Sequence, residues 1–267
     1  MFLPFIPGDY DGLAVTLSTM AQISGIAGLL LVPIGIFWLV TEIINTRKKD
    51  EKNANKTAYR FAIVSLIVSC IIGIAISIGA LIGTGPTFGI LTFVACIYIV
   101  SKFIVQFLKM KKEGNIKFGP IPFYLICIPS IIVLIRFMFI IPATEFSRNH
   151  AIRQSEILIR DIESYYATHG HYPISLLSLR SDYKPSVIGI KQYRYEPFEN
   201  AYNLCFEQFS YQIGVSEIVM YNKLDEQDIS SHDTDLLVLA PDQINLQRGH
   251  LEVHDLPNPH WKYFWFD

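Results

Sequence analysis

The sequence predicts a membrane protein in two parts, with four transmembrane helices in residues 1–142 and an α+β domain in residues 143–267. Three observations predict this fold class. Four long apolar runs are confined to the first part, amphipathic patterning replaces them after Pro142, and the two parts carry opposite net charge. In the second part we expect an amphipathic helix that packs on a small antiparallel sheet.

Composition already excludes several classes of protein. The chain has 267 residues, of which 51% are hydrophobic and 17% charged, and its mean hydropathy is +0.33. These values exclude a disordered chain, a collagen-like chain and a strongly basic nucleic-acid-binding protein. Four Cys residues are too few for a disulfide scaffold.

The apolar runs lie at about 13–43, 61–83, 88–108 and 121–141. About 20 apolar residues in a helix cross a hydrocarbon core of about 30 Å. Each run is long enough, so we predict four membrane spans surrounded by lipid. Pro33 and Pro129 fall inside two of these runs, where each removes a backbone donor and can kink its helix.

Charge predicts the orientation. Residues 1–142 hold 12 Lys and Arg against 6 Asp and Glu, whereas residues 143–267 hold 10 against 18. Basic residues cluster between the first and second runs and between the third and fourth. The positive-inside rule places both clusters in the cytoplasm. We therefore expect a bacterial inner-membrane protein with both termini outside the cytoplasm.

Small residues recur every four positions in the second run, at Ser65, Ser69, Gly73 and Ser77. Such spacing lets helices approach closely. Packing within the four-helix region is the commoner outcome, and a homo-oligomer contact through the same face is the alternative.

An amphipathic helix is predicted over residues 151–166. One face carries the following residues at helical spacing: Ala151, Ser155, Leu158, Ile159, Ile162, Tyr165 and Tyr166. Gly170 is a natural helix stop, and Pro173 prevents the helix from resuming.

Short strands are predicted after this helix. Tyr202, Leu204 and Phe206 share one face of such a strand, and the segments 193–195, 217–221 and 261–266 are rich in β-branched or aromatic residues. A helix followed by several short strands is typical of an α+β domain.

Residues 157–179 resemble the pseudopilins of type II secretion and related type IV pilin-like proteins. In that family a helix ends in a Tyr, a Gly-x-Tyr-Pro turn and a Leu-rich segment. The matching positions here are Tyr165, Gly170, Tyr172, Pro173, Leu176 and Leu179. The resemblance implies a membrane helix that runs directly into this helix, with a small antiparallel sheet packed on it. Residues 115–126 lack the Glu that the family carries near the start of its helix. The resemblance therefore implies the domain fold and binding to other extracytoplasmic proteins, rather than polymerisation.

Two groups of residues are candidate metal ligands. His250, Glu252 and His254 alternate along a predicted strand, so they share a face that could bind zinc. The acidic loop 225–235 could bind calcium through carboxylates, and the candidates are Asp225, Asp228, Asp233 and Asp235. A solvated strand face and a solvated loop are the commoner alternatives, and no other cofactor is expected.

The aromatic run 260–267 offers a candidate partner-binding surface. Trp261, Tyr263 and Trp265 point one way on a strand. Burial of this strand in the domain core is the commoner outcome, and docking on a partner or on the membrane interface is the alternative.

These observations favour an integral inner-membrane protein that presents its outer domain for protein–protein interaction or envelope assembly, without enzymatic activity. The sequence contains no Gly-x-Ser-x-Gly, His-Glu-x-x-His, Cys-x-x-Cys or P-loop motif. Two alternatives remain open at this stage: an accessory protein of a transporter or sensor, and a metal-dependent envelope enzyme that uses the His250 region.

Overall fold

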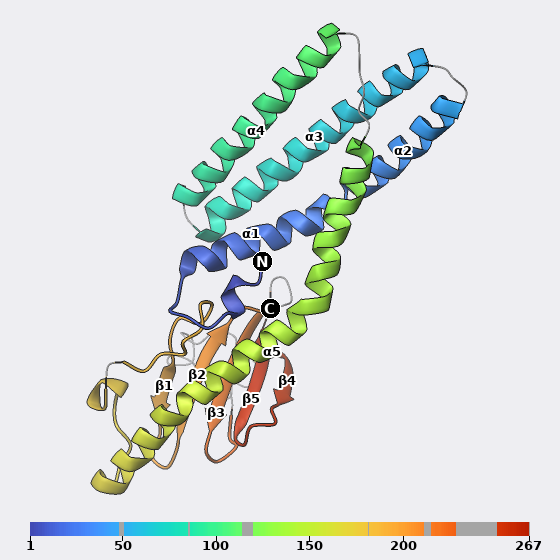
Figure 1. The fold of residues 1–267 in the computed structure, drawn as a ribbon. Helices are drawn as coiled ribbons and strands as arrows, with labels where there is room; N and C mark the ends of the chain where they lie inside the picture. The colour runs from blue at the N-terminus through green and yellow to red at the C-terminus, as the bar shows by residue number, and fades with distance from the viewer. Residues whose placement is uncertain are drawn as a thin grey trace. The chain divides into compact units, whose positions relative to one another are not determined.

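A computed structural model describes residues 1–47, 51–84, 86–113, 120–180, 182–210, 215–227 and 250–266 (Figure 1). The chain divides into two compact units. The first contains Thr16–Met138, and the second contains Phe2–Val15 together with Phe139–Asp267. Each unit is described here by itself.

The first unit is helical. Its helices are α1 (Gly12–Gly28), α2 (Leu31–Arg47), α3 (Glu51–Thr84), α4 (Pro86–Glu113) and the first part of α5 (Ile121–His169). Two stretches, Lys56–Leu81 of α3 and the apolar part of α5, are long and apolar enough to cross a membrane, and the pair α1–α2 would add a third. In α4 the apolar stretch Gly89–Val105 is shorter. The lengths and composition of these helices are thus compatible with a membrane protein.

The first apolar run, predicted as one stretch over 13–43, is broken. Helices α1 and α2 meet at Leu29 and Leu30 with a bend of 42°. Pro33 lies in the first turn of α2, a position where its missing N–H costs no helical hydrogen bond. The proline thus accounts for a new helix that begins at Leu31. Pro129, in contrast, lies within α5 without ending it.

Part of the small-residue face of α3 packs within the chain, although Ser69 is exposed. A Cβ atom added at Gly73 would meet Sγ of Cys96 on α4. Ser65 and Ser77 on the same helix are buried. The Cys96 side chain therefore lies against the α3 backbone at Gly73, and a larger residue at position 73 would require that side chain to move.

Helix α5 is a single helix of 49 residues, so the amphipathic helix predicted over 151–166 is part of a longer one. Its predicted buried face is confirmed, since Ala151, Ser155, Leu158 and Ile162 are all fully buried. The helix ends at Gly170, whose φ of +73° is a left-handed conformation that glycine adopts without strain.

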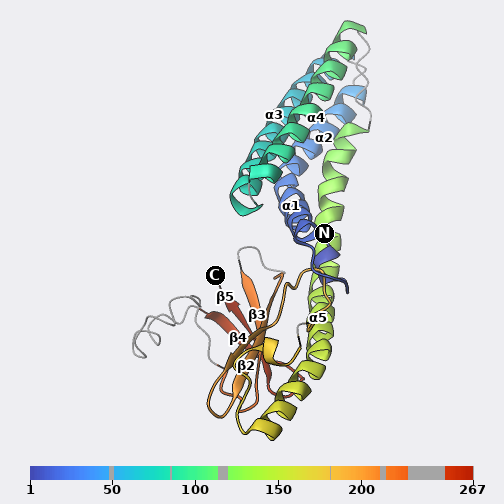
Figure 2. The same cartoon turned by 90° about the vertical axis from the view of Figure 1, so that its left-hand side faces the viewer.

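A five-stranded antiparallel sheet completes the second unit. Its strands are β1 (Arg194–Pro197), β2 (Tyr202–Gln208), β3 (Ser216–Asn222), β4 (His250–Asp255) and β5 (Trp261–Phe266). They lie in the order β1-β2-β3-β5-β4, and the second part of α5 runs beside them (Figures 1 and 2). Tyr202, Leu204 and Phe206 are fully buried and pack with Leu158 and Ile162 in one core, as their alternation predicts.

An N-terminal segment joins this second unit, which the sequence did not predict. The short helix η1 (Leu3–Phe5) is followed by a bridge between Pro7 and Val187. Backbone N–H groups of Gly8, Ile188 and Gly189 donate across this contact at 2.8–3.0 Å. Phe5 is buried, and its ring meets the ring of Phe209 edge-on at 5.8 Å. Residues 2–11 are therefore structural members of the sheet-containing unit.

Candidate functional site

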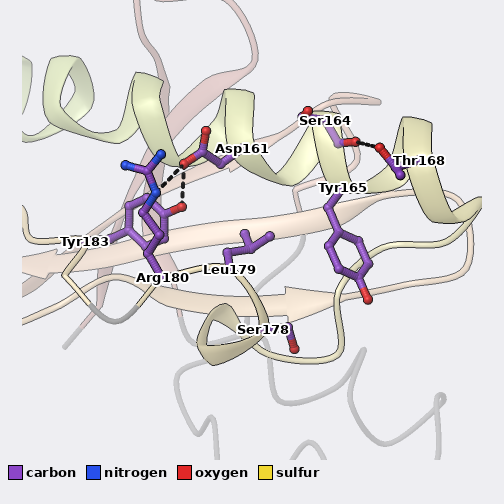
Figure 3. A pocket seen from close by; sticks show the side chains of 8 residues that line it. All are labelled: Asp161, Ser164, Tyr165, Thr168, Ser178, Leu179, Arg180 and Tyr183. Carbon is purple, nitrogen blue, oxygen red and sulfur yellow. Dashed lines mark hydrogen bonds and ion pairs between the residues drawn. The ribbon is translucent and has the colours of Figure 1, made fainter.

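A groove of about 310 Å³ lies beside the last turns of α5 (Figure 3). One wall is α5, and the other is formed by Ser178 at the end of the short helix η2 (Leu176–Ser178) and by Leu179, Arg180 and Tyr183 after it. Its lining is mostly polar and comprises Asp161, Ser164, Tyr165, Thr168, Ser178, Leu179, Arg180 and Tyr183.

Asp161 organises one end of this groove. The Tyr183 hydroxyl donates to Oδ2 of Asp161 at 2.6 Å, and Nε of Arg180 lies 3.5 Å from the same oxygen (Figure 3). Burial, together with the hydrogen bond to Asp161, raises the pKa of Tyr183. The phenol therefore stays protonated near neutral pH and remains a donor. This arrangement is suited to binding a ligand through hydrogen bonds rather than to general acid–base catalysis.

Two large apolar side chains project from the residues that precede the far wall in the sequence. Ile174 is 86% exposed and Leu177 is 81% exposed. The segment is held in place, because Oγ of Ser175 accepts from the Leu177 N–H at 3.1 Å and the Tyr195 hydroxyl donates to the Pro173 carbonyl at 3.0 Å. Ordered apolar side chains that face solvent mark a surface suited to contact with another molecule.

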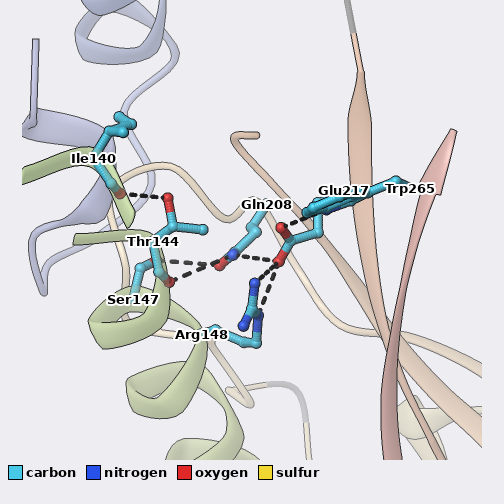
Figure 4. A network of polar contacts seen from close by, with 7 residues as sticks. All are labelled: Ile140, Thr144, Ser147, Arg148, Gln208, Glu217 and Trp265. Carbon is cyan, nitrogen blue, oxygen red and sulfur yellow. Dashed lines mark hydrogen bonds and ion pairs between the residues drawn. The ribbon is translucent and has the colours of Figure 1, made fainter. Parts of the chain in front are cut away.

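A buried polar network joins α5 to strands β2, β3 and β5 (Figure 4). Its centre is Glu217, which is fully buried. Its Oε1 accepts from Nε and Nη2 of Arg148 at 2.9 and 2.6 Å and from Nε2 of Gln208 at 2.7 Å. Its Oε2 accepts from Nε1 of Trp265 at 3.1 Å. The Arg148 guanidinium also lies 4.0 Å from the centre of the Tyr263 ring.

This network holds the sheet on the helix. Both oxygens of Glu217 have donors, and Arg148 is only 6% exposed, so the charges are paired out of contact with water. The sequence does contain a signal for it. Glu217 alternates with Val219 and Tyr221, two core residues of β3, so its side chain falls on the face that packs on α5.

The predicted zinc ligands lie on β4, but a register shift falls between His250 and Glu252. A bulge of this kind interrupts the alternation on which the prediction rests. His254 stacks on Tyr263 with the ring centroids 4.5 Å apart and meets Trp265 edge-on at 4.6 Å. Within the described residues, no three or more His, Cys, Asp or Glu side chains are grouped to hold a metal ion.

Of the predicted calcium ligands, the structure describes Asp225. It has a φ of 59°, and its Oδ2 lies 3.0 Å from Nδ1 of His260. Asp228, Asp233 and Asp235 lie outside the described residues.

The predicted partner-binding aromatics lie on β5 and face the domain itself. Trp261 is buried, 5.5 Å from the ring of Tyr221 and 5.9 Å from the ring of Phe206. Trp265 is also buried and donates to Glu217, while Tyr263 is half-buried beneath Arg148.

The helical unit holds a separate cavity of about 270 Å³ between α2, α3, α4 and α5. Trp38, Leu66, Phe103 and Leu125 are among its lining residues, and the hydroxyl groups of Ser65 and Ser69 lie among them. Elsewhere in this unit, Nε of the buried Arg136 donates to Oε1 of Gln22 at 3.2 Å. The apolar lining of the cavity suits a hydrocarbon chain better than a polar solute.

Comparison with protein-family models, curated proteins and solved structures finds no match to this chain. The groove beside α5 therefore has to be interpreted from its own chemistry.

Proposed function

We propose that this chain is an integral inner-membrane protein whose pilin-like extracytoplasmic domain binds another envelope protein. The observations that carry the proposal are the groove of Figure 3 and the exposed side chains of Ile174 and Leu177, which precede its far wall in the sequence. A partner segment would place an apolar side chain against these two residues and hydrogen-bond within the groove. An apolar contact bordered by polar groups is the usual anatomy of a protein–protein interface.

The continuity of α5 supports the pilin-like character of the domain. One helix runs from an apolar segment at Ile121 to an amphipathic one that ends at His169, and an antiparallel sheet packs on its second part. These are the features that the resemblance of residues 157–179 to pseudopilins implies.

The position of the N-terminal segment supports an even number of membrane crossings. Residues 2–11 pair with residues 184–190, and this pairing supports a location of both on the same side of the membrane. Three crossings between them would not permit this pairing. If α1–α2, α3 and α5 all cross, α4 must cross as well, and four spans follow. The basic clusters between the runs then favour both termini outside the cytoplasm.

A paired substitution tests the docking surface. The full chain carrying Ile174→Asp and Leu177→Asp is expressed in native membranes, with a photo-crosslinking residue in place of Thr168 on the groove wall. We expect a specific crosslinked partner in the wild-type background and its loss in the double variant. In the double variant the same contact would bury two unpaired carboxylates, and burial of an unpaired charge is strongly unfavourable.

The matched control is Phe198→Asp, which also places a charge at an exposed apolar side chain, but after strand β1. This control should keep the crosslink. A crosslink of equal yield in the double variant, or equal loss in the control, would contradict the proposed surface.

The described residues give little support to the two alternative functions, an accessory protein of a transporter or sensor and a metal-dependent envelope enzyme. An accessory of a transporter would need a polar path, whereas the cavity of the helical unit is apolar. A metal-dependent enzyme would need converging ligands near His250, where the bulge in β4 interrupts their alternation.

A further inference from the structure

Two histidines face solvent across the glycine at which α5 ends. His169 is the last residue of the helix, and His171 follows Gly170. Both side chains are exposed. Because Gly170 is left-handed, the chain turns sharply and brings the two ring centroids to 6.1 Å, with their planes at 54°.

Both rings are fixed in the same tautomer. Nδ1 of His169 lies 3.0 Å from the Tyr165 carbonyl oxygen, and Nδ1 of His171 lies 3.0 Å from the Tyr172 carbonyl oxygen. A carbonyl oxygen only accepts, so each Nδ1 carries the hydrogen. In the neutral imidazole this leaves the lone pair on Nε2 of both rings.

Tyr165 orients the pair further. Its ring stacks on His169 at 4.0 Å and 16°, and it meets His171 edge-on at 5.8 Å. Each imidazole thus has a hydrogen bond that sets its rotation and an aromatic neighbour that limits its movement. Metal-binding histidines are typically oriented in this way, with the second nitrogen donating to a backbone carbonyl.

We propose that His169 and His171 bind one divalent transition-metal ion through their Nε2 atoms. Imidazole nitrogens bind zinc at about 2.1 Å, so two rings that share an ion have centroids roughly 5–6 Å apart. The observed centroid separation of 6.1 Å is close to this range. Imidazole suits zinc, copper and nickel. The carboxyl end of α5 adds a partial negative charge that attracts a cation.

The site has two protein ligands, and water completes the coordination. The site is distinct from the predicted zinc ligands on β4.

Zinc titration of the full chain in detergent micelles, purified without a histidine tag, tests the site. We expect calorimetry to show one zinc ion per chain. Mutation of a residue that hydrogen-bonds to a metal ligand typically lowers metal affinity about 10–100-fold. Loss of a ligand itself should lower the affinity for zinc at least as much. His169→Gln and His171→Gln should each reach that range, and the double variant should abolish binding.

Two other histidine variants serve as controls. His150→Gln alters a helical histidine that stacks on Phe146, and His254→Gln alters one of the predicted ligands on β4. Both should bind zinc as the wild type does. Unchanged binding in the double variant, or loss of binding in His254→Gln, would overturn the proposal.

Copper provides a readout of the ligands themselves. The electron paramagnetic resonance spectrum of one equivalent of Cu²⁺ should show coupling to imidazole nitrogen in the wild type and in His150→Gln. The His169→Gln, His171→Gln double variant should lack that coupling while its near-ultraviolet circular dichroism is unchanged. A spectrum that is identical in the double variant would place the ion elsewhere.

Discussion

Individual buried charges set the alignment of the sheet on α5. Glu217 and Arg148 are both buried, and their attraction offsets the cost of removing them from water only because the geometry is nearly complete. Gln208 and Trp265 supply the remaining donors to the carboxylate. An ion pair of this kind selects one register between helix and sheet, since any shift would leave a charge without its partner.

Removal of one member of this pair should be costly. We expect Glu217→Ala to lower the free energy of unfolding by about 3–5 kcal/mol, because Arg148 would remain buried without a counter-charge. Urea unfolding of the full chain in detergent micelles, followed by near-ultraviolet circular dichroism, measures the change.

The matched control is Glu207→Ala on β2. Glu207 pairs with Arg194 at 3.8 Å, and both side chains are about half exposed. Loss of this exposed ion pair should lower the free energy of unfolding by about 0.5 kcal/mol or less. Equal effects of the two substitutions would show that the buried pair does not stabilise the unit.

Buried tyrosines make the second unit sensitive to alkali. Burial raises the pKa of Tyr193, whose hydroxyl donates to the Ala151 carbonyl at 2.6 Å. Burial, with a smaller contribution from Tyr221, also raises the pKa of Tyr202. Because the folded pKa lies above the unfolded value of about 10, this stability is complete below about pH 10 and is lost as the pH rises further.

We therefore expect the tyrosinate absorbance of these residues to appear only when the unit unfolds. An absorbance titration run in parallel with circular dichroism measures both. The variant Tyr193→Phe should make the alkaline transition less steep in pH, because the unfolded chain then has one fewer phenol to ionise. Ionisation well before loss of the circular dichroism signal would contradict this account.

Among the elements, α5 buries one face and exposes another in the sheet-containing unit. Neighbouring residues on it differ sharply in burial: Leu158 is fully buried, whereas Ile157 is 45% exposed. We expect Leu158→Ala to cost about 2–5 kcal/mol, because it leaves a cavity in the core. Ile157→Ala should cost about 1 kcal/mol or less. The same urea unfolding measurement compares them, and similar losses would mean that the helix packs by a different face.

The faces of helix and strand could be predicted from the sequence because they depend on local periodicity. Leu158 and Ile162 follow the helical period, and Tyr202 and Leu204 follow the strand period. The bulge in β4 could not be predicted in this way, since it depends on the pairing of His250 and Glu252 with another strand. The groove likewise needs Asp161 and Tyr183 to meet, and their contact is not local in sequence.

At the scale of the whole molecule, the number of crossings determines where each end lies. We expect a periplasm-active phosphatase fused after Asp267 to be active and a cytosol-only fluorescent protein fused there to be dark. Fusions after Glu113, at the end of α4, should give the opposite pattern, because the adjacent basic residues favour the cytoplasm. Fluorescence from the fusion after Asp267 would refute the orientation.

The pairing of residues 2–11 with residues 184–190 has a consequence for the order of biosynthesis. Phe5 is translated before its partner Phe209, and helices α1–α5 all lie between them in the sequence. The early segment remains without these partners until the rest of its unit has been made. Contacts between such distant parts of a chain form slowly. Closure of this long loop is therefore a late step in maturation. An extension attached at Met1 should slow this step more than an extension attached after Asp267.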